Sequence, residues 1–472
     1  MRELRAGELA LLIGARLVGD PSTPLGPDVV IDSRVATPGC VFVALPGERA
    51  DGHDFAPTAV AAGAAAVLGT RLLDLPVPQL LVQDAASALA SLATTLVAQA
   101  RPAGLVSVGI TGSSGKTSTK DLIAQVLSAA GPTVAPVGSF NNEIGVPLTA
   151  TRIDADTRFL VSELGARGQG HITWLCGIVA PQVGVVVNVG HAHLGEFGSV
   201  AAIARAKGEL VAALPADGWA VLNADDALVA GMTGRARSRI ATFAIGAEPS
   251  FGDLRVWASE VSADALQRPA FTLSVGGTLT GTARVQLRVT GQVQVGNALA
   301  AAAVGFTQGL SVDDVAAGLA AATARSRWRM ELSERSDGVL VVNDAYNANP
   351  DSMSAALRTL AALRRPGGRL LAVLGDMLEL GPDAAAEHTA IGSLAAELGV
   401  DALLAVGTFA PDLVAGATAG QVDARAVADR EEAAAAADAW LRPADVVLVK
   451  ASRGLALETV ADHLTHREAE GR

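Results

Sequence analysis

Cysteines, aromatic residues and long uncharged apolar runs are scarce or missing in this chain of 472 residues. Its 2 cysteines, Cys40 and Cys176, are too few for a disulfide framework, which is typical of a reducing compartment. No run of about 18 uncharged apolar residues occurs, so a membrane-spanning helix is excluded. The first residues alternate in charge and lack the apolar segment of a secretion signal. We therefore expect a cytoplasmic protein.

Aromatic residues make up only 3% of the chain, although 50% of it is hydrophobic. The core must then be built mainly from alanine, valine and leucine. The net charge of −12 argues against a general nucleic-acid binder, although it does not exclude a local basic pocket for an anion. The length exceeds that of one ordinary core and predicts two to four domains.

Strand-like and alanine-rich helical stretches alternate through most of the chain, which indicates doubly wound, largely parallel α/β sheets. Residues 254–292 depart from this pattern and predict an antiparallel extension of the central domain. Arg101-Pro102 ends a predicted helix, and residues 325–329 form a predicted hinge. We expect a small N-terminal α/β domain, a central phosphate-loop domain and a C-terminal Rossmann-like domain, at residues 1–102, 103–325 and 326–472.

The segment LVSVGITGSSGKTSTK, residues 105–120, predicts a nucleotide-phosphate site. A β-branched strand passes through a glycine/serine loop into a helix, so backbone N–H groups and the positive helix end face an anion. Lys116 can reach phosphates and the Thr117 hydroxyl can hold Mg²⁺, although Ile110 replaces the usual first glycine. A chance turn is the alternative, which the Lys-Thr pair disfavours. The predicted loop comprises Gly112, Ser113, Ser114, Gly115, Lys116, Thr117 and Ser118.

Glu163 and Lys207 are candidates for metal chemistry. Glu163 ends a predicted strand near the loop, where a carboxylate suits Mg²⁺, but a salt-bridged strand end is the alternative. Lys207 shares the apolar face of a predicted helix, residues 200–214, with Ile203 and Leu210. A buried lysine tends toward the neutral amine, which can add CO₂ and become an anionic carbamate. Snorkelling, or pairing with an acid such as Glu163, is the alternative.

Polar residues also follow two other predicted strands. Ser33 and Arg34 suit a phosphorylated or anionic group, with a capped turn as the alternative. His191 and His193 are spaced to hold a metal or to carry a proton, but two turn histidines are as readily structural.

The last third of the chain offers further candidates for binding. Arg327 in the hinge would bring a cation onto a γ-phosphate when the domains close. Residues 343–350 offer amides and a tyrosine for a nucleoside, and residues 450–454 offer cations for a substrate carboxylate. Caps and surface charge are the alternatives.

Together these strings closely resemble the Mur ligase family, in order from about residue 30 to residue 460. The matching strings include DSR at 32–34, TGSSGKTS at 111–118, NNEIGVP at 141–147, AKGE at 206–209, NALA at 297–300 and LGDMLELG at 374–381. The resemblance implies that ATP phosphorylates the carboxylate of a UDP-N-acetylmuramoyl-tripeptide and that the amine of D-Ala-D-Ala attacks the acyl phosphate. The Asp-Asn-Pro-Arg string of the relative that adds meso-diaminopimelate is missing, which favours the dipeptide as substrate.

The resemblance also implies roles for individual residues. Thr117 and Glu163 would bind one Mg²⁺, and His193 with carbamylated Lys207 a second. The residues implied at the nucleotide, beside the loop, are Asn297, Arg327, Asp344, Tyr346 and Asn347. Those implied at the other substrates are Ser33, Arg34, Asn142, Ser452 and Arg453. Lys116, Lys207, His193 and Arg327 would be catalytic.

One string departs from the family. Gly291-Gln292-Val293-Gln294 stands where relatives often have Gly-x-His-Asn, so a nucleotide contact by that histidine is absent. Another Mur-type or folylpolyglutamate-type ligase, and a phosphate-loop ATPase without amide chemistry, are the alternative functions. We expect a monomer.

Overall fold

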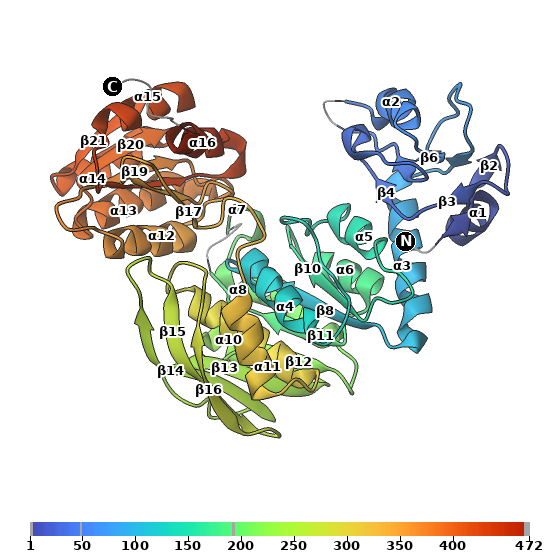
Figure 1. The fold of residues 1–472 in the computed structure, drawn as a ribbon, viewed down its shortest axis with the longest axis horizontal. Coiled ribbons are helices and arrows are strands. Elements are labelled where there is room, and N and C mark those ends of the chain that lie inside the picture. Colours follow the sequence, from blue (N-terminus) through green and yellow to red (C-terminus); the bar gives the residue numbers. More distant parts are fainter. Residues whose placement is uncertain (1–2, 48–49, 191–193, 467–472) are drawn as a thin grey trace.

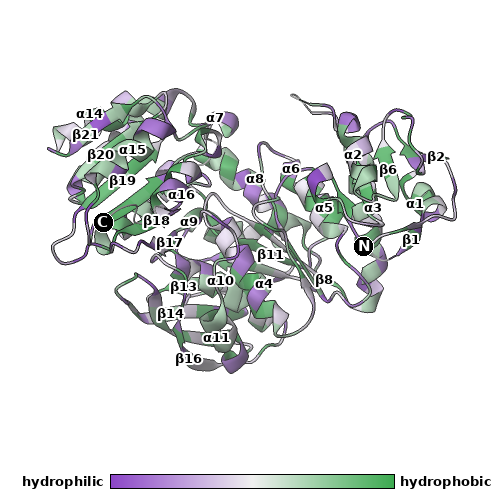
Figure 2. Ribbon diagram, turned by 45° about the horizontal axis from the view of Figure 1, so that its top comes forward, coloured by the Kyte–Doolittle hydropathy of each residue, from purple (hydrophilic) through white to green (hydrophobic). Residues whose placement is uncertain are grey.

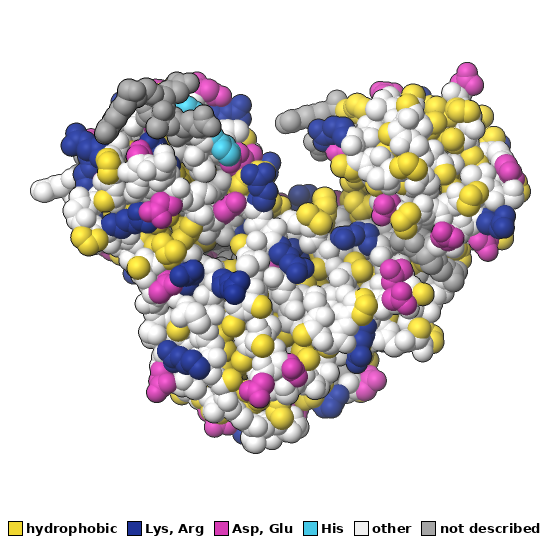
Figure 3. Space-filling view, viewed as in Figure 1, with side chains coloured by type: hydrophobic (Ala, Val, Ile, Leu, Met, Phe, Trp, Pro, Cys, Tyr) yellow, Lys and Arg dark blue, Asp and Glu magenta, His cyan; other side chains and the backbone are white. Residues whose placement is uncertain are grey.

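The computed structural model describes residues 3–47, 50–190 and 194–466, which form three α/β domains (Figure 1). The N-terminal and C-terminal domains stand apart on the same side of the central domain, and Figure 3 shows a hollow between them. The apolar residues gather on the strands at the middle of each domain (Figure 2). No described helix is long and apolar enough to cross a membrane.

The N-terminal domain has a five-stranded sheet in the order β2-β7-β6-β5-β4, parallel except for β2, and a β1-β3 hairpin-like pair. Asp84 caps its long last helix, because its carboxylate accepts from the Ser87 N–H at 2.6 Å, and this helix packs on helices of the central domain. The elements are β1 (Leu4–Arg5), α1 (Ala6–Ile13), β2 (Arg16–Val18), β3 (Pro24–Leu25), β4 (Val29–Val30), β5 (Val41–Val43), α2 (Ala56–Ala61), β6 (Ala66–Gly69), β7 (Gln79–Leu81) and α3 (Ala85–Ala100).

The central domain has a nine-stranded sheet in the order β16-β15-β14-β13-β12-β11-β8-β10-β9. The strands from β9 to β14 are parallel, and β15 and β16 are antiparallel, so the expected antiparallel extension is confirmed. The strands are β8 (Val106–Thr111), β9 (Thr133–Val134), β10 (Phe159–Glu163), β11 (Val183–Val186), β12 (Trp219–Asn223), β13 (Arg239–Ile245), β14 (Leu254–Ala263), β15 (Pro269–Gly277) and β16 (Gly281–Gln286). The helices are α4 (Lys116–Ser128), α5 (Gly145–Ala150), α6 (His171–Val179), α7 (Leu194–Phe197), α8 (Val200–Ala213), α9 (Ala227–Ala230), α10 (Gln294–Thr307) and α11 (Val312–Ala321).

Both faces of the sheet are buried at β8, β10, β11 and β12, which explains their continuous apolar runs, whereas β14 and β16 alternate between more buried and more exposed residues. One face packs on α4, α10 and α11 in an alanine- and valine-rich core. The other face shares a core with α6 and with α3 of the N-terminal domain. The N-terminal domain is therefore joined to the central one by packed apolar side chains.

The C-terminal domain has a six-stranded sheet in the order β17-β18-β22-β19-β20-β21, in which only β17 is antiparallel. Four elements of this domain were not predicted from the sequence: β17, α14, β21 and α16. Of these, α14 is built of small residues and β21 is a largely exposed edge strand with charged positions. The elements are β17 (Glu331–Glu334), β18 (Leu340–Asn343), α12 (Pro350–Ala362), β19 (Leu370–Gly375), α13 (Ala384–Glu397), β20 (Ala402–Val406), α14 (Ala410–Ala419), β21 (Asp423–Val427), α15 (Arg430–Trp440), β22 (Val446–Lys450) and α16 (Glu458–His466).

Candidate active site

A cavity of about 830 Å³ lies between the central and C-terminal domains. Its walls include the phosphate loop, Glu163 and Lys207 from the central domain, and Asp344 and residues 346–349 from the C-terminal domain. The carboxyl ends of β8 and β10 lead into it, as expected for ligand sites of open α/β sheets.

The phosphate loop joins β8 to α4 through a backbone that requires glycine. Gly115 has φ of +78°, and a Cβ there would lie 2.7 Å from Oδ1 of Asn297. No side chain caps the first turn of α4, which begins at Lys116. Uncapped N–H groups and the helix dipole together favour an anion at this end of the helix.

Asn188 braces the beginning of the loop. Its Oδ1 accepts from the N–H groups of Ser113 and Ser114, each at 2.9 Å, and Ser113 Oγ accepts from the Gly190 N–H at 2.8 Å. The loop amides are expected to hold phosphate, and in this structure these two are bonded to Asn188. The amides at the start of α4 are left for an anion.

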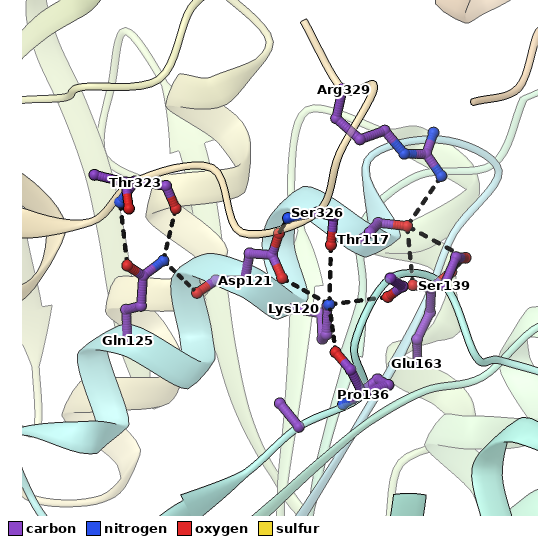
Figure 4. A network of polar contacts seen from close by, with 12 residues as sticks. Thr117, Lys120, Asp121, Gln125, Pro136, Ser139, Glu163, Thr323, Ser326 and Arg329 are labelled. Carbon is purple, nitrogen blue, oxygen red and sulfur yellow. Dashed lines mark hydrogen bonds and ion pairs between the residues drawn. The ribbon is translucent and has the colours of Figure 1, made fainter. Parts of the chain in front are cut away.

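Thr117 and Glu163 form a polar cluster at the base of the cavity (Figure 4). Thr117 Oγ1 donates to Glu163 Oε2 at 2.9 Å, while Ser139 Oγ and Asn141 Nδ2 donate to Oε1 at 2.8 and 2.7 Å. Glu163 is buried, with 1% of its surface exposed. Ser139 was not among the predicted site residues; it follows Gly138, whose positive φ of +70° turns the chain before it.

These oxygens suit Mg²⁺, which binds proteins through one or two carboxylates and otherwise uses water and substrate phosphates. Among the described residues no group of three His, Cys, Asp or Glu side chains is placed to hold a metal. A bound Mg²⁺ would therefore rely on Glu163, Thr117 and phosphate oxygens. His193, the expected ligand of a second ion, lies outside the described residues.

Two lysines approach the loop from the central domain. Lys116 Nζ donates to the Gly112 carbonyl at 2.7 Å, and burial lowers the pKa of Lys116 against the opposing effect of Glu163. Burial, and then the charge of Lys116, lower the pKa of Lys207 well below its ordinary value. No hydrogen bond or ion pair to another described residue holds the Lys207 amine, so the alternative of a Lys207–Glu163 pair is not found.

Arg329, not Arg327, reaches the phosphate loop from the interdomain linker. Arg329 Nη2 donates to Thr117 Oγ1 at 3.1 Å, and its guanidinium lies 4.2 Å from the centre of the Tyr346 ring. The side chain of Arg327 is 68% exposed and lies 3.9 Å from Asp462. Trp328 separates the two arginines and has φ of +60°, so the chain turns between them and their side chains diverge.

Asp344, which was expected to contact the nucleoside, is hydrogen-bonded to Lys450 and to the Met330 backbone. Its Oδ2 accepts from Lys450 Nζ at 2.6 Å and its Oδ1 from the Met330 N–H at 3.1 Å. Burial lowers the pKa of Lys450, while Asp344 opposes that shift. Tyr346 and Asn347 line the cavity, as does Asn297, which accepts from Thr119 Oγ1 at 3.1 Å and donates to Gln294 at 2.9 Å.

The expected substrate residues fall into two groups. Asn142, Ser452 and Arg453 line the cavity. Asn142 Oδ1 accepts from the Gly145 N–H at 2.9 Å, Ser452 Oγ accepts from the Leu378 N–H at 3.0 Å, and Arg453 pairs with Glu458. Ser33 and Arg34 lie in the N-terminal domain and do not line it. There the Arg34 side chain hydrogen-bonds Asp32 and lowers the pKa of that carboxyl to about 2.

Comparison with known proteins matches all three domains of the chain. Residues 28–95 match the Mur ligase family catalytic domain, 110–305 the Mur ligase middle domain, and 328–453 the Mur ligase glutamate ligase domain.

Whole-chain similarity extends this result. The UDP-N-acetylmuramoyl-tripeptide–D-alanyl-D-alanine ligase of Mycobacterium tuberculosis is 48% identical, over 92% of this chain and 91% of the relative. The Escherichia coli ligase of that name is 39% identical, over 92% of each chain.

Two solved structures share the fold. Crystal structure I of MurF from Acinetobacter baumannii has a TM-score of 0.84 at 33% identity, covering 99% of this chain and 100% of that one. MurF ligase from Thermotoga maritima in complex with ADP has a TM-score of 0.76 at 28% identity, covering 93% and 97%. The chain belongs to the Mur ligase family.

Proposed function

We propose that this protein joins D-Ala-D-Ala to a UDP-N-acetylmuramoyl-tripeptide, with ATP as the energy source. The observation that carries the proposal is the juxtaposition, in one cavity, of an uncapped phosphate loop, a buried carboxylate and a linker arginine from the neighbouring domain. The substrates come from the named relatives, whose similarity covers nine-tenths of the chain.

ATP and Mg²⁺ fit the groups at the base of the cavity. The first-turn amides of α4 and Lys116 would hold the β- and γ-phosphates, and Arg329 would add a second cation on the side of the C-terminal domain. Glu163 and the Thr117 hydroxyl would hold Mg²⁺, which neutralises phosphate charge during transfer. We assign to Arg329 the role that the sequence analysis gave to Arg327.

The reaction then has two steps. The tripeptide carboxylate attacks the γ-phosphorus, which forms an acyl phosphate and releases ADP. The free amine of D-Ala-D-Ala attacks the acyl carbon, forms the amide, loses a proton and releases phosphate. Lys116 and Arg329 favour the first step because they stabilise the negative charge that moves onto the phosphate oxygens.

Lys207 fits a carbamate better than an ammonium. Its amine is buried, its pKa is lowered and Lys116 repels its positive charge, so the neutral form that adds CO₂ is favoured. A carbamate would replace an amine that has no partner among the described residues by an anionic oxygen ligand near Lys116. With His193, it would serve a second Mg²⁺.

Mass spectrometry of the reaction products tests the proposal. The protein is incubated with UDP-N-acetylmuramoyl-tripeptide, D-Ala-D-Ala and Mg-ATP, and each component is omitted in turn. We expect one pentapeptide product and one ADP per cycle. Turnover with a different amine would indicate another Mur-type or folylpolyglutamate-type ligase, and ATP hydrolysis that does not depend on an amine would indicate an ATPase.

A further inference from the structure

Lys120 is a buried cation on the phosphate-loop helix, one turn beyond Lys116 and outside the cavity wall. Only 1% of its surface is exposed. Its Nζ lies 2.6 Å from the Asp121 carboxylate, and it donates to the carbonyls of Pro136 and Gly138 at 2.8 and 2.9 Å and to Ser326 Oγ at 3.2 Å (Figure 4). A buried ammonium is stable only when such partners surround it, so the charge of Lys120 holds these groups in place around it.

The partners of Lys120 outside α4 belong to two segments, and each of these segments also contacts Thr117 or Glu163. Two residues of the 136–141 segment, Ser139 and Asn141, contact Glu163. The interdomain linker, residues 323–330, contributes Arg329 to Thr117. One side chain therefore ties α4 to both flanks of the Thr117–Glu163 pair.

The first half of the linker, up to Ser326, is attached to α4 of the central domain. The Ser326 N–H donates to Asp121 at 2.9 Å, and Gln125 exchanges two hydrogen bonds with Thr323. From Arg327 onward the partners lie mainly in the C-terminal domain, for example Tyr346, whose N–H donates to the Trp328 carbonyl at 3.3 Å. The anchor at Ser326 is thus the last central attachment before Arg329 returns to the phosphate loop.

We propose that Lys120 is a positioning residue, which holds the linker and the 136–141 segment so that Arg329, Ser139 and Asn141 surround Thr117 and Glu163 together. The proposal rests on the proposed function for the reaction it serves. Because Lys120 does not line the cavity, it acts on the geometry of phosphoryl transfer more than on nucleotide binding. Its loss would leave two carbonyls and the Asp121 carboxylate without their cation.

Three variants separate this role from general stability. Lys120→Met removes all the contacts, and Ser326→Ala removes only the bond to the linker hydroxyl. Leu127→Ala is the matched control, because Leu127 is fully buried on the same helix but has no polar contact with either segment. Each variant is assayed for kcat, KM for ATP, ADP dissociation constant, melting temperature and amide hydrogen exchange.

Displaced catalytic groups lower kcat steeply, so Lys120→Met should lose about 10- to 100-fold in kcat while its ADP dissociation constant changes by less than about threefold. Exchange should rise in both residues 136–141 and 323–329. Ser326→Ala should raise exchange in the linker alone, with a smaller loss of kcat. Leu127→Ala should lower the melting temperature and keep kcat.

An unchanged kcat in Lys120→Met, or a loss that Leu127→Ala reproduces at an equal melting temperature, overturns the proposal. If Lys120→Met does not fold, unchanged exchange and kcat in Ser326→Ala overturn it. If the unmodified protein makes no pentapeptide, the proposed function is what fails. The exchange pattern alone then supports or overturns the two attachments.

Discussion

At the scale of single residues, Lys116, Lys207, Arg329 and Lys450 all line the cavity, and they differ in their hydrogen-bond partners. Lys116, Arg329 and Lys450 retain hydrogen-bond partners, whereas the Lys207 amine has none among the described residues. The first three are suited to binding anions, and Lys207 is suited to chemistry on its nitrogen. Two predictions test this difference.

Lys116→Ala should fold normally and lose most of its turnover. Removing one preorganised charge from a transferring phosphoryl group typically costs on the order of 10²–10³ in rate. The measurement is steady-state pentapeptide formation, with circular dichroism as the control for folding. Near-normal activity would contradict the assignment of the phosphate loop.

Lys207→Ala should lose more than about 100-fold in activity, because an anionic group of the site is removed. Added acetate or formate should restore part of that activity by supplying a carboxylate to the gap. Lys207→Arg should stay inactive with or without these salts.

The carbamate itself is observable by NMR with ¹³C-bicarbonate above the lowered pKa of Lys207. At pH values above that pKa the neutral amine, which adds CO₂, is the main form. Acidification below the pKa should protonate the amine, release CO₂ and abolish the carbamate resonance. An active Lys207→Arg enzyme would refute the carbamate and leave the ligase proposal standing.

At the scale of elements, the strand–loop–helix unit of β8 and α4 works because glycine occupies its turn. Gly115 adopts a conformation that L side chains rarely reach, and its nearest neighbour is the side chain of Asn297. Gly177 in α6 offers a contrast, since it is exposed, helical and has open space where a Cβ would stand.

Gly115→Ala should lower the free energy of unfolding by about 1–2 kcal/mol from the left-handed backbone alone. It should also weaken nucleotide binding, because the clash with Asn297 moves the loop. Gly177→Ala should raise stability by about 0.5–1 kcal/mol, since alanine loses less entropy in a helix. Chemical denaturation and ADP titration measure both, and equal effects of the two variants would contradict the loop geometry.

At the scale of the whole molecule, the two outer domains stand apart over the central one (Figure 3). The C-terminal domain already touches the central domain through α7, where the Gly195 N–H donates to the Glu379 carbonyl at 3.1 Å. Ser33 and Arg34, proposed for the UDP-linked substrate, lie in the N-terminal domain outside the cavity. A substrate that reaches from Ser33 and Arg34 to the cavity therefore requires the N-terminal domain to move toward the cavity.

Small-angle scattering should therefore show a smaller radius of gyration when the UDP-tripeptide and a non-hydrolysable ATP analogue are bound together. ATP analogue alone serves as the control and should produce a smaller change, because its cavity already lies between two contacting domains. Identical dimensions with and without all ligands would contradict closure.

The sequence by itself determined much of this protein. The residues 105–120 predicted a strand, a loop and a helix, because glycine, lysine and threonine at that spacing are typical of a phosphate loop. The turn signals within residues 254–292 predicted the antiparallel strands. The apolar face around Lys207 correctly predicted its burial in α8, since helical periodicity is a local property. Local patterns of this kind specify a secondary-structure element and the face on which each of its residues lies, because both depend only on neighbours in the sequence.

Only the tertiary structure decided which groups meet. Arg329 and not Arg327 contacts Thr117, because a left-handed residue lies between the two arginines. The hydrogen bonds from the Ser113 and Ser114 amides to Asn188 also could not be read from any local pattern. Two partners of Lys120, Pro136 and Ser326, lie 16 and 206 positions away in the sequence. Such contacts depend on how strands, loops and domains pack, and sequence periodicity describes each element but not the orientation of one against another.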